Sequence, residues 1–344
     1  GRIEVDPWLP AGAPSPKVAA PAVPVKSARR EWSRDRIDTS GLMAADADIT
    51  LDAEQVVYGA YVIDNAKLGA ILKDGVLTLN KFAGGMFGGS IVASGKLAHG
   101  SVPSVGLNLE IKQADIRKAA LAASGVAKVD GVLDYQTDMS SRGASEHALV
   151  SALSGTGSIL VRDGVIEGLD LPIVSKQLDK LNRPVDFLTL VEKAMKGGTT
   201  PFKSLTASYQ IKKGVLRSED ITLESPAAAG RGTAVVNLPP QEMDTRIKFW
   251  LVEHENSPPM GVRFIGPLDN PRMVLDIEKL QAYVLQRVVE RGILRQFEKK
   301  SKPQTGDNGT TQTAPAAAPT APVEQKKLTP EDALKGILKG LLKQ

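Results

Sequence analysis

The stretch DADITLDAE, residues 46–54, alternates polar and apolar side chains without a break. In an extended chain Ala47, Ile49, Leu51 and Ala53 share one face, and the acidic residues and Thr50 take the other. The same period of two returns at residues 105–112, 205–211 and 243–251. This alternation is typical of antiparallel strands that have one face in water. The sequence therefore predicts a mainly β fold.

Short Gly-containing pairs separate several of these segments and predict hairpin turns, since both central positions of a tight turn favour positive φ. The four pairs are Asp74-Gly75, Asp130-Gly131, Asp163-Gly164 and Lys213-Gly214. Their spacing is irregular, which argues against a repeating solenoid. We expect a meander of unequal hairpins.

Few segments have a helical pattern. One runs from Pro172 to Lys196 with an expected break at Pro184, and a second covers residues 277–298. A last helix is predicted at 328–344, where Thr329 is a suitable N-cap and Pro330 a suitable first residue. Its apolar positions are Leu334, Ile337, Leu338, Leu341 and Leu342. Such a short helix could bind an anionic membrane surface, a partner protein or its own domain.

Composition excludes several classes of protein. The 344 residues include no Cys, so there is no disulfide framework, thiolate metal site or cysteine nucleophile. The net charge is only +4, and no basic stretch is interleaved with aromatic residues, so we expect no nucleic-acid partner. No window of about 18 apolar residues is present to span a bilayer.

The chain divides into five segments by composition. Residues 1–10 contain a strand-like start, Gly1-Arg-Ile-Glu-Val-Asp, which suggests a piece of a longer protein. Residues 11–30 are a linker rich in Pro and Ala, and 301–327 are a second low-complexity linker. The predicted folded domain is 31–300, followed by the helix at 328–344.

No pattern of catalytic residues is found. His99, His147 and His254 lie in unrelated polar or turn-like segments, where exposed surface positions are the expectation. The pair Gly95-Lys96 lacks the other residues of a phosphate-binding loop, and no Gly-x-Ser-x-Gly elbow occurs. We therefore predict no enzyme, no metal site and no cofactor.

The strands pose a question of how their apolar face is covered. Two helical segments are few for so many strands, and only 3 Trp, 5 Tyr and 7 Phe are available to fill a core. The sheet could close into a barrel, pack against a second sheet, or curl into an open groove lined by apolar side chains. Periodicity does not choose among the three.

Four stretches together resemble the C-terminal region of the AsmA family of bacterial envelope proteins. Residues 151–171, SALSGTGSILVRDGVIEGLDL, are similar to a Gly-rich signature of that family, and so are 68–97, with Asp74-Gly75 and Gly88-Gly89. Residues 202–238 and the closing segment IGPLDNP, 265–271, are similar to two further units, although Pro267 stands where Ser or Thr is usual. The four stretches occur in the family's order, and together they cover roughly residues 31–300. Residues 1–10 are similar to the last strand of the preceding module.

This resemblance implies a fold and a role. The implied fold is a curved antiparallel sheet of hairpins that forms an open apolar groove or partial barrel, with a few α-helices, as in related bridge-like lipid-transfer proteins. The implied role is to conduct phospholipid between the inner and outer membranes of Gram-negative bacteria, in support of outer-membrane assembly. The implied location is the periplasm, with an N-terminal helix, absent from this chain, as the tether to the inner membrane.

The physical demand on such a conduit is large. Moving a two-chain lipid into water exposes roughly 30 methylenes at ~0.8 kcal/mol each, about 24 kcal/mol in all. A continuous apolar strip would cancel most of this cost. The candidate lipid-facing residues are Ile49, Leu51, Leu77, Leu79, Ile91, Leu107, Leu109, Tyr209, Ile211, Ile247, Phe249 and Leu251. Ordinary core packing is the alternative for these residues, and a periplasmic scaffold acting through protein contacts is the alternative function.

Overall fold

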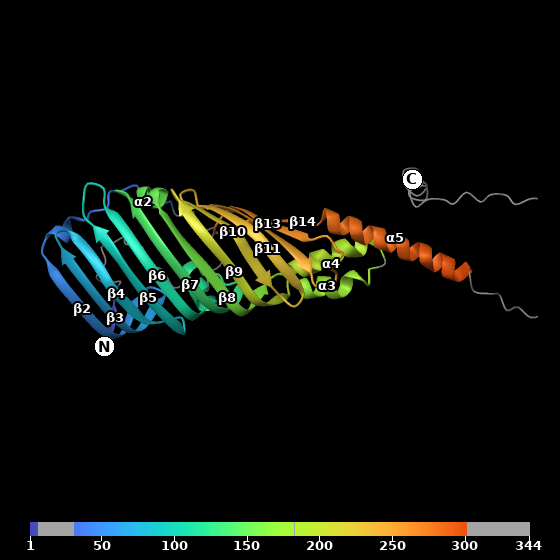
Figure 1. Ribbon diagram of the computed structural model, residues 1–344, viewed down its shortest axis with the longest axis horizontal. Helices are drawn as coiled ribbons and strands as arrows, with labels where there is room; N and C mark the ends of the chain where they lie inside the picture. Colours follow the sequence, from blue (N-terminus) through green and yellow to red (C-terminus); the bar gives the residue numbers. More distant parts are fainter. Residues whose placement is uncertain (6–30, 182, 301–344) are drawn as a thin grey trace, which may run out of the picture. The chain divides into compact units, whose positions relative to one another are not determined.

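The fold is built on one open sheet of fourteen strands in the order of the chain, β1 to β14 (Figure 1). The computed structural model describes residues 1–5, 31–181 and 183–300; the predicted linkers and the predicted helix at 328–344 lie outside these residues. The described residues up to Arg295 form one compact unit. The strands are β1 (Arg2–Glu4), β2 (Ala47–Tyr58), β3 (Tyr61–Lys73), β4 (Val76–Met86), β5 (Gly89–Ala98), β6 (Ser104–Asp115), β7 (Val129–Arg142), β8 (Ser154–Glu167), β9 (Thr199–Lys212), β10 (Val215–Glu224), β11 (Ala228–Asn237), β12 (Glu242–Leu251), β13 (Met260–Pro267) and β14 (Arg272–Asp276).

The sheet confirms the predicted meander. Every strand from β2 onward is antiparallel to the next, and only the short β1 runs parallel to its neighbour β2. The four alternating segments lie in β2, β6, β9 and β12, with only Asp46 of the first segment just before its strand. The two end strands, β1 and β14, do not pair with each other, so the sheet is not a closed barrel. Since all strands belong to one sheet, it is not a sandwich either.

Two of the four predicted hairpins are present. Asp74 and Gly75 have φ of 48° and 73°, and Lys213 and Gly214 have φ of 49° and 73°, as a tight two-residue turn requires. The other two predictions are wrong. Asp130-Gly131 lies within β7 and Asp163-Gly164 within β8, next to a shift in the β7–β8 register between Asp130 and Val132. Bulges also favour residues that accept positive φ, so the same dipeptide serves both structures.

The two predicted internal helices are confirmed, including the break. They are α3 (Leu171–Leu178) and α4 (Pro184–Lys196), with Pro184 at the start of α4, and α5 (Glu278–Lys300). Two shorter helices were not predicted: α1 (Ile116–Ser124) and α2 (Glu146–Ala152). The Asp115 side chain caps α1 by accepting from the Lys118 amide, and Gly125 ends it in the left-handed conformation. Both α1, with 9 residues, and α2, with 7, are too short to show a clear helical period in the sequence.

An N-terminal segment, residues 31–46, crosses four connections along one edge of the sheet, and we call it the edge strap. The indole of Trp32 donates to the Leu238 carbonyl (2.9 Å), beyond β11, and the Ile37 amide donates to the Ala144 carbonyl (2.8 Å), between β7 and β8. Farther along, the Thr39 hydroxyl lies 2.8 Å from His99 Nδ1, and Asp46 accepts from the Asp74 amide (3.1 Å). The strap therefore ties together the connections of the β-meander from β11 to β3.

An ion-pair cluster joins β12 to β13 on the polar face. The Arg263 guanidinium donates to both carboxylate oxygens of Asp244, each at 2.7 Å, and Arg246 donates to one of them at 3.0 Å. The hydrogen bonds from Arg263, followed by those from Arg246, lower the pKa of Asp244 from 3.8 to about 2. The charged carboxylate is thus favoured in the folded protein.

Acid should weaken the fold through this cluster. Because the folded pKa is lower than the unfolded one, the stabilisation is present above pH 3.8 and is lost as pH falls toward about 2. For a partly exposed pair we expect roughly 1 kcal/mol. Urea unfolding of wild type and Asp244→Asn across that range is the measurement. The variant should be less stable at neutral pH and should converge with wild type at the acid end; a constant difference would contradict the assignment.

The apolar face of the sheet as a candidate functional site

The predicted lipid-facing residues all lie on one face of the sheet. Residues paired across neighbouring strands point to the same side, so the pairing register defines the faces. One row runs Ile49, Ala70, Leu79, Gly95, Leu107, Met139, Gly155, Ile211 and Leu216. Parallel rows carry Leu51, Leu77, Ile91, Leu109, Tyr209, Ile247, Phe249 and Leu251. We call this side the apolar face and the opposite side the polar face.

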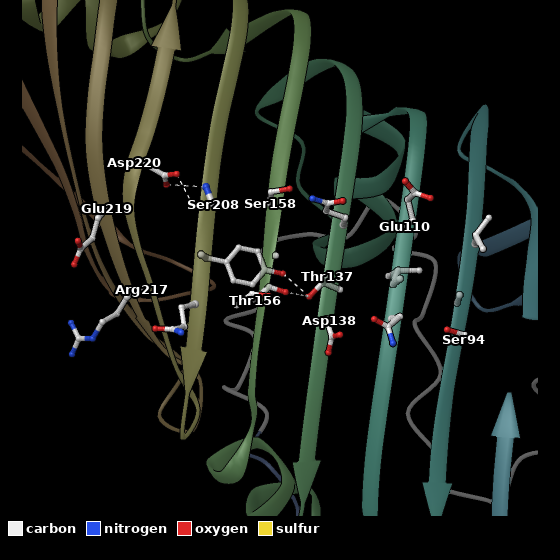
Figure 2. Close-up of a pocket in the computed structure, with 18 residues that line it drawn as sticks. Ser94, Glu110, Thr137, Asp138, Thr156, Ser158, Ser208, Arg217, Glu219 and Asp220 are labelled. Carbon is white, nitrogen blue, oxygen red and sulfur yellow. Dashed lines mark hydrogen bonds between the residues drawn. The ribbon is translucent and has the colours of Figure 1, made fainter. Parts of the chain in front are cut away.

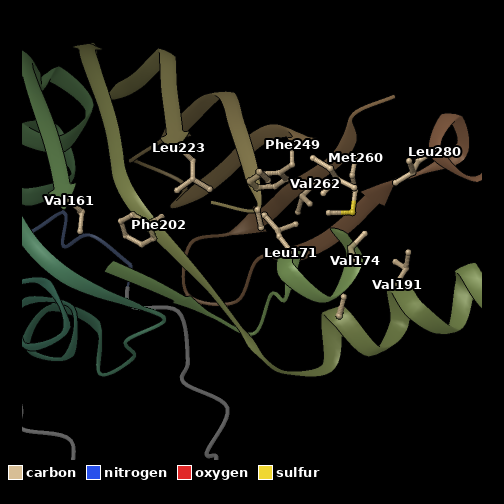
Figure 3. Close-up of a cluster of buried hydrophobic side chains, with 14 of the residues drawn as sticks. Val161, Leu171, Val174, Val191, Phe202, Leu223, Phe249, Met260, Val262 and Leu280 are labelled. Carbon is tan, nitrogen blue, oxygen red and sulfur yellow. The ribbon is translucent and has the colours of Figure 1, made fainter. Parts of the chain in front are cut away.

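One end of the apolar face is covered by helices. Phe249 and Leu251 are each 3% exposed and belong to the same buried cluster as Leu171 and Val174 of α3 and Phe187 of α4. Figure 3 shows Phe202, Leu223, Phe249 and Val262 on the strands, facing Leu171, Val174 and Val191 of the helices, with Leu280 of α5 alongside. Ile247 packs against this cluster. Ordinary core packing is what the structure shows for this group.

The opposite end of the face is more open. Ile49 is 41% exposed, and Leu51, Leu77, Leu79, Leu107 and Leu109 are half-buried among their neighbours on the face. We call these six residues the open strip; they come from β2, β4 and β6. Ile91 of β5 is buried, in the cluster against which Ile116 and Ala119 of α1 also pack. The predicted set thus divides into a covered group and an uncovered one.

A chain of hydroxyl groups crosses the middle of the apolar face. The Tyr135 and Tyr209 hydroxyls lie 2.7 Å apart, Tyr209 donates to Thr137 (3.0 Å), and Thr137 donates to the Thr156 carbonyl (3.0 Å). Burial, followed by the bond to Tyr209, raises the pKa of Tyr135, so the Tyr135 phenol stays neutral. Tyr209 was predicted from the sequence, but Tyr135 and Thr137 were not. Their positions in an alternating strand are the only sequence signal.

This crossing requires a glycine between the two tyrosines. Gly157 pairs with Thr137 on β7 and with Tyr209 on β9. A Cβ at position 157 would lie 2.3 Å from the Tyr209 hydroxyl and 2.4 Å from the adjoining ring carbon. The Tyr209 side chain therefore lies across Gly157 of β8, and its hydroxyl reaches the Tyr135 and Thr137 hydroxyls of β7.

The prediction for one histidine is wrong. His254 is buried, not exposed: its Nε2 lies 2.7 Å from the Ser175 carbonyl of α3, and its Nδ1 lies 3.6 Å from an oxygen of Asp179. Asp179 also binds Arg287 of α5 at 2.6 Å. The histidine joins the β12–β13 connection to α3, a long-range contact that a local sequence pattern does not reveal.

The polar groups described above bind the backbone or one another. The hydroxyl chain ends on a backbone carbonyl, and the charged cluster at Asp179 holds helices together. Within the described residues, no three His, Asp or Glu side chains are grouped to hold a metal ion. In the same part of the chain, no helix is both long enough and apolar enough to cross a membrane.

The described residues thus define a class of protein: an open, almost wholly antiparallel sheet whose apolar face is partly covered by helices. The sequence model of the AsmA family matches residues 10–221, which is more than half of the chain, and the chain belongs to that family. Membership is consistent with roles in envelope lipid transport or envelope assembly. No curated protein and no solved structure matches the chain significantly.

Proposed function

We propose that this protein is a non-enzymatic envelope protein that shields the acyl chains of phospholipids on the open strip as they pass between the inner and outer membranes. The observation that carries this proposal is that apolar rows run from β2 to β8 on one face and that the six residues of the open strip, at the β2–β6 end, are exposed or half-buried. Family membership supports it. The proposed setting is the periplasm, with a tether in the inner membrane.

Energetics favour a lipid over water on this strip. Each methylene moved from water onto apolar side chains gains ~0.8 kcal/mol. Strands alone provide the strip, so its chemistry changes little from one strand to the next. We therefore propose weak discrimination along the strip and no single lipid pocket. Phe249, Leu251 and Ile247 are left out of the proposed contacts because protein already packs there.

Leu109→Asp is expected to lower lipid binding strongly without unfolding the protein. Leu109 is half-buried in the open strip, so the aspartate can reach water, but it places a charge where acyl chains would lie. The measurement is transfer of a fluorescent-acyl phospholipid from vesicles to the full chain, with native mass spectrometry of the product. We expect at least a tenfold loss of bound lipid, in line with about 1.4 kcal/mol or more of lost affinity.

Val92→Asp is the matched control. Val92 lies on the adjacent strand β5, is 44% exposed and faces the polar side. The substitution adds the same charge to the same part of the sheet, and lipid binding should stay at the wild-type level. Wild type that takes up no lipid, or equal binding by folded Leu109→Asp, would contradict the proposal and favour a scaffold that works through protein contacts.

A further inference from the structure

The polar face carries a hollow of about 940 Å³ that spans β5 to β10. Its floor consists of two rows of paired residues on the polar face, and five residues of the apolar-face rows also line it: Ala93, Leu109, Thr137, Gly157 and Tyr209. One row runs Ser94, Asn108, Asp138, Thr156 and Gln210, and the other runs Val92, Glu110, Gln136, Ser158 and Ser208. Figure 2 shows Ser94, Glu110, Asp138, Ser158 and Ser208 along successive strands. Of the six residues of the open strip, Leu109 is also among the residues that line this hollow.

The chemistry of the floor differs from the rest of the polar face. Elsewhere on that face, opposite charges pair across strands, as in Arg162 with Asp134 and Arg263 with Asp244. The hollow instead gathers uncharged amides and hydroxyls, from Asn108, Gln136 and Gln210 together with Thr156, Ser158 and Ser208. These groups offer both donors and acceptors. Among the described residues, no side-chain hydrogen bond is found for the three amides.

A β-bulge fixes one wall of the hollow. The register between β10 and both of its neighbours shifts between Ser218 and Thr222, where Glu219 and Asp220 project. Asp220 accepts from the Ser208 amide (2.9 Å) and from its hydroxyl (2.6 Å). Because backbone and side-chain bonds hold this carboxylate, the wall is preorganised, as bulges near binding sites often are.

The charge around the hollow argues against an anionic ligand. Four carboxylates line it, from Glu110, Asp138, Glu219 and Asp220, against a single cation, Arg217. Glu110 is already paired with Lys112 (2.6 Å) and Asp220 is held by Ser208, which leaves Asp138 in the floor and Glu219 in the wall. Free carboxylates accept hydrogen bonds from hydroxyl groups, and the amides and hydroxyls of the floor offer no counter-ion for a phosphate. A ligand rich in hydroxyl groups suits both the carboxylates and the uncharged amides and hydroxyls of the hollow.

From this arrangement we infer that the hollow binds an uncharged oligosaccharide, laid across the strands. From β5 to β10 the hollow crosses five strand spacings, about 24 Å, which suits a linear chain of several sugar rings. Exposed amides and hydroxyls at regular strand spacing would meet the hydroxyls of successive rings. The Asn108, Gln136 and Gln210 side chains point away from the open strip, since adjacent residues of a strand point to opposite faces.

The test uses the full chain and two neutral probes, chitopentaose and maltopentaose, in isothermal titration calorimetry. We expect one of them to bind. The double variant Asn108→Ala, Gln136→Ala should lower the affinity by about tenfold or more, because each lost hydrogen bond weakens binding severalfold. Both residues are surface-exposed, so the variant should fold. Thr50→Ala, an exposed position of the polar face on β2, should bind as wild type does.

Three outcomes would overturn the inference. The first is that neither sugar binds the wild-type protein. The second is that the double variant binds as well as wild type. The third is that tetralysine binds in place of the sugars and loses its affinity in Asp138→Asn, Glu219→Gln, which would make the hollow a site for basic peptides. The lipid assay is decided separately, by Leu109→Asp, whose side chain points to the apolar face.

Discussion

Phe249→Ala is expected to lower the free energy of unfolding by about 3–5 kcal/mol, the range for removing a fully buried aromatic ring. Phe249 is 3% exposed, pairs with Gly230 and Met260, and shares its cluster with α3 and α4. A Cβ at Gly230 would lie 3.1 Å from the Phe249 ring, so the ring packs directly on that glycine. The alanine variant leaves a cavity that these neighbours cannot close. Urea unfolding followed by circular dichroism is the measurement.

The next residue provides a matched control. Trp250 is also aromatic but lies on the polar face and is 38% exposed. Trp250→Ala should cost less than about 1 kcal/mol, as surface changes usually do. A similar loss of stability in both variants would contradict the assignment of the two faces at β12. The comparison also shows why Phe249 is unsuited to a lipid-binding test, because loss of lipid there could not be separated from loss of structure.

Gly157→Ala should destabilise the protein by roughly 1–3 kcal/mol, as overpacking in a tight site does. The added methyl would meet the Tyr209 hydroxyl and, at 2.6 Å, the Gln136 carbonyl. To make room, Tyr209 must leave its place across β8, and its bonds to Tyr135 and Thr137 break. Urea unfolding measures the loss of stability.

A second readout separates this mechanism from general strain. Burial and the bond to Tyr209 raise the pKa of Tyr135 above its usual value of 10. In a folded Gly157→Ala variant, a tyrosine should therefore ionise at lower pH than in wild type, which ultraviolet titration detects. Gly106→Ala on β6 is the control, since no atom lies closer than 4.0 Å to its added methyl. An unchanged titration in Gly157→Ala would mean that the hydroxyl chain does not depend on the glycine.

Much of the fold follows from local pattern. The alternation at residues 46–54 places Ile49 and Leu51 on the face where the register also puts Leu79 and Leu107. The same rule places all twelve candidates on one face, because side chains of a strand alternate whatever its partners are. The break before α4 was equally readable, since Pro184 favours the first turn of a helix.

Contacts between distant segments decided the rest. Whether Phe249 meets lipid or protein depends on α3, which is over seventy residues earlier in the chain, and the burial of His254 depends on Ser175 of the same helix. Asp163-Gly164 became a bulge because both neighbouring strands continue past it. A residue's own sequence neighbourhood fixes its backbone preference and its face. Tertiary packing alone determines what covers that face, because burial requires a partner that local sequence does not specify.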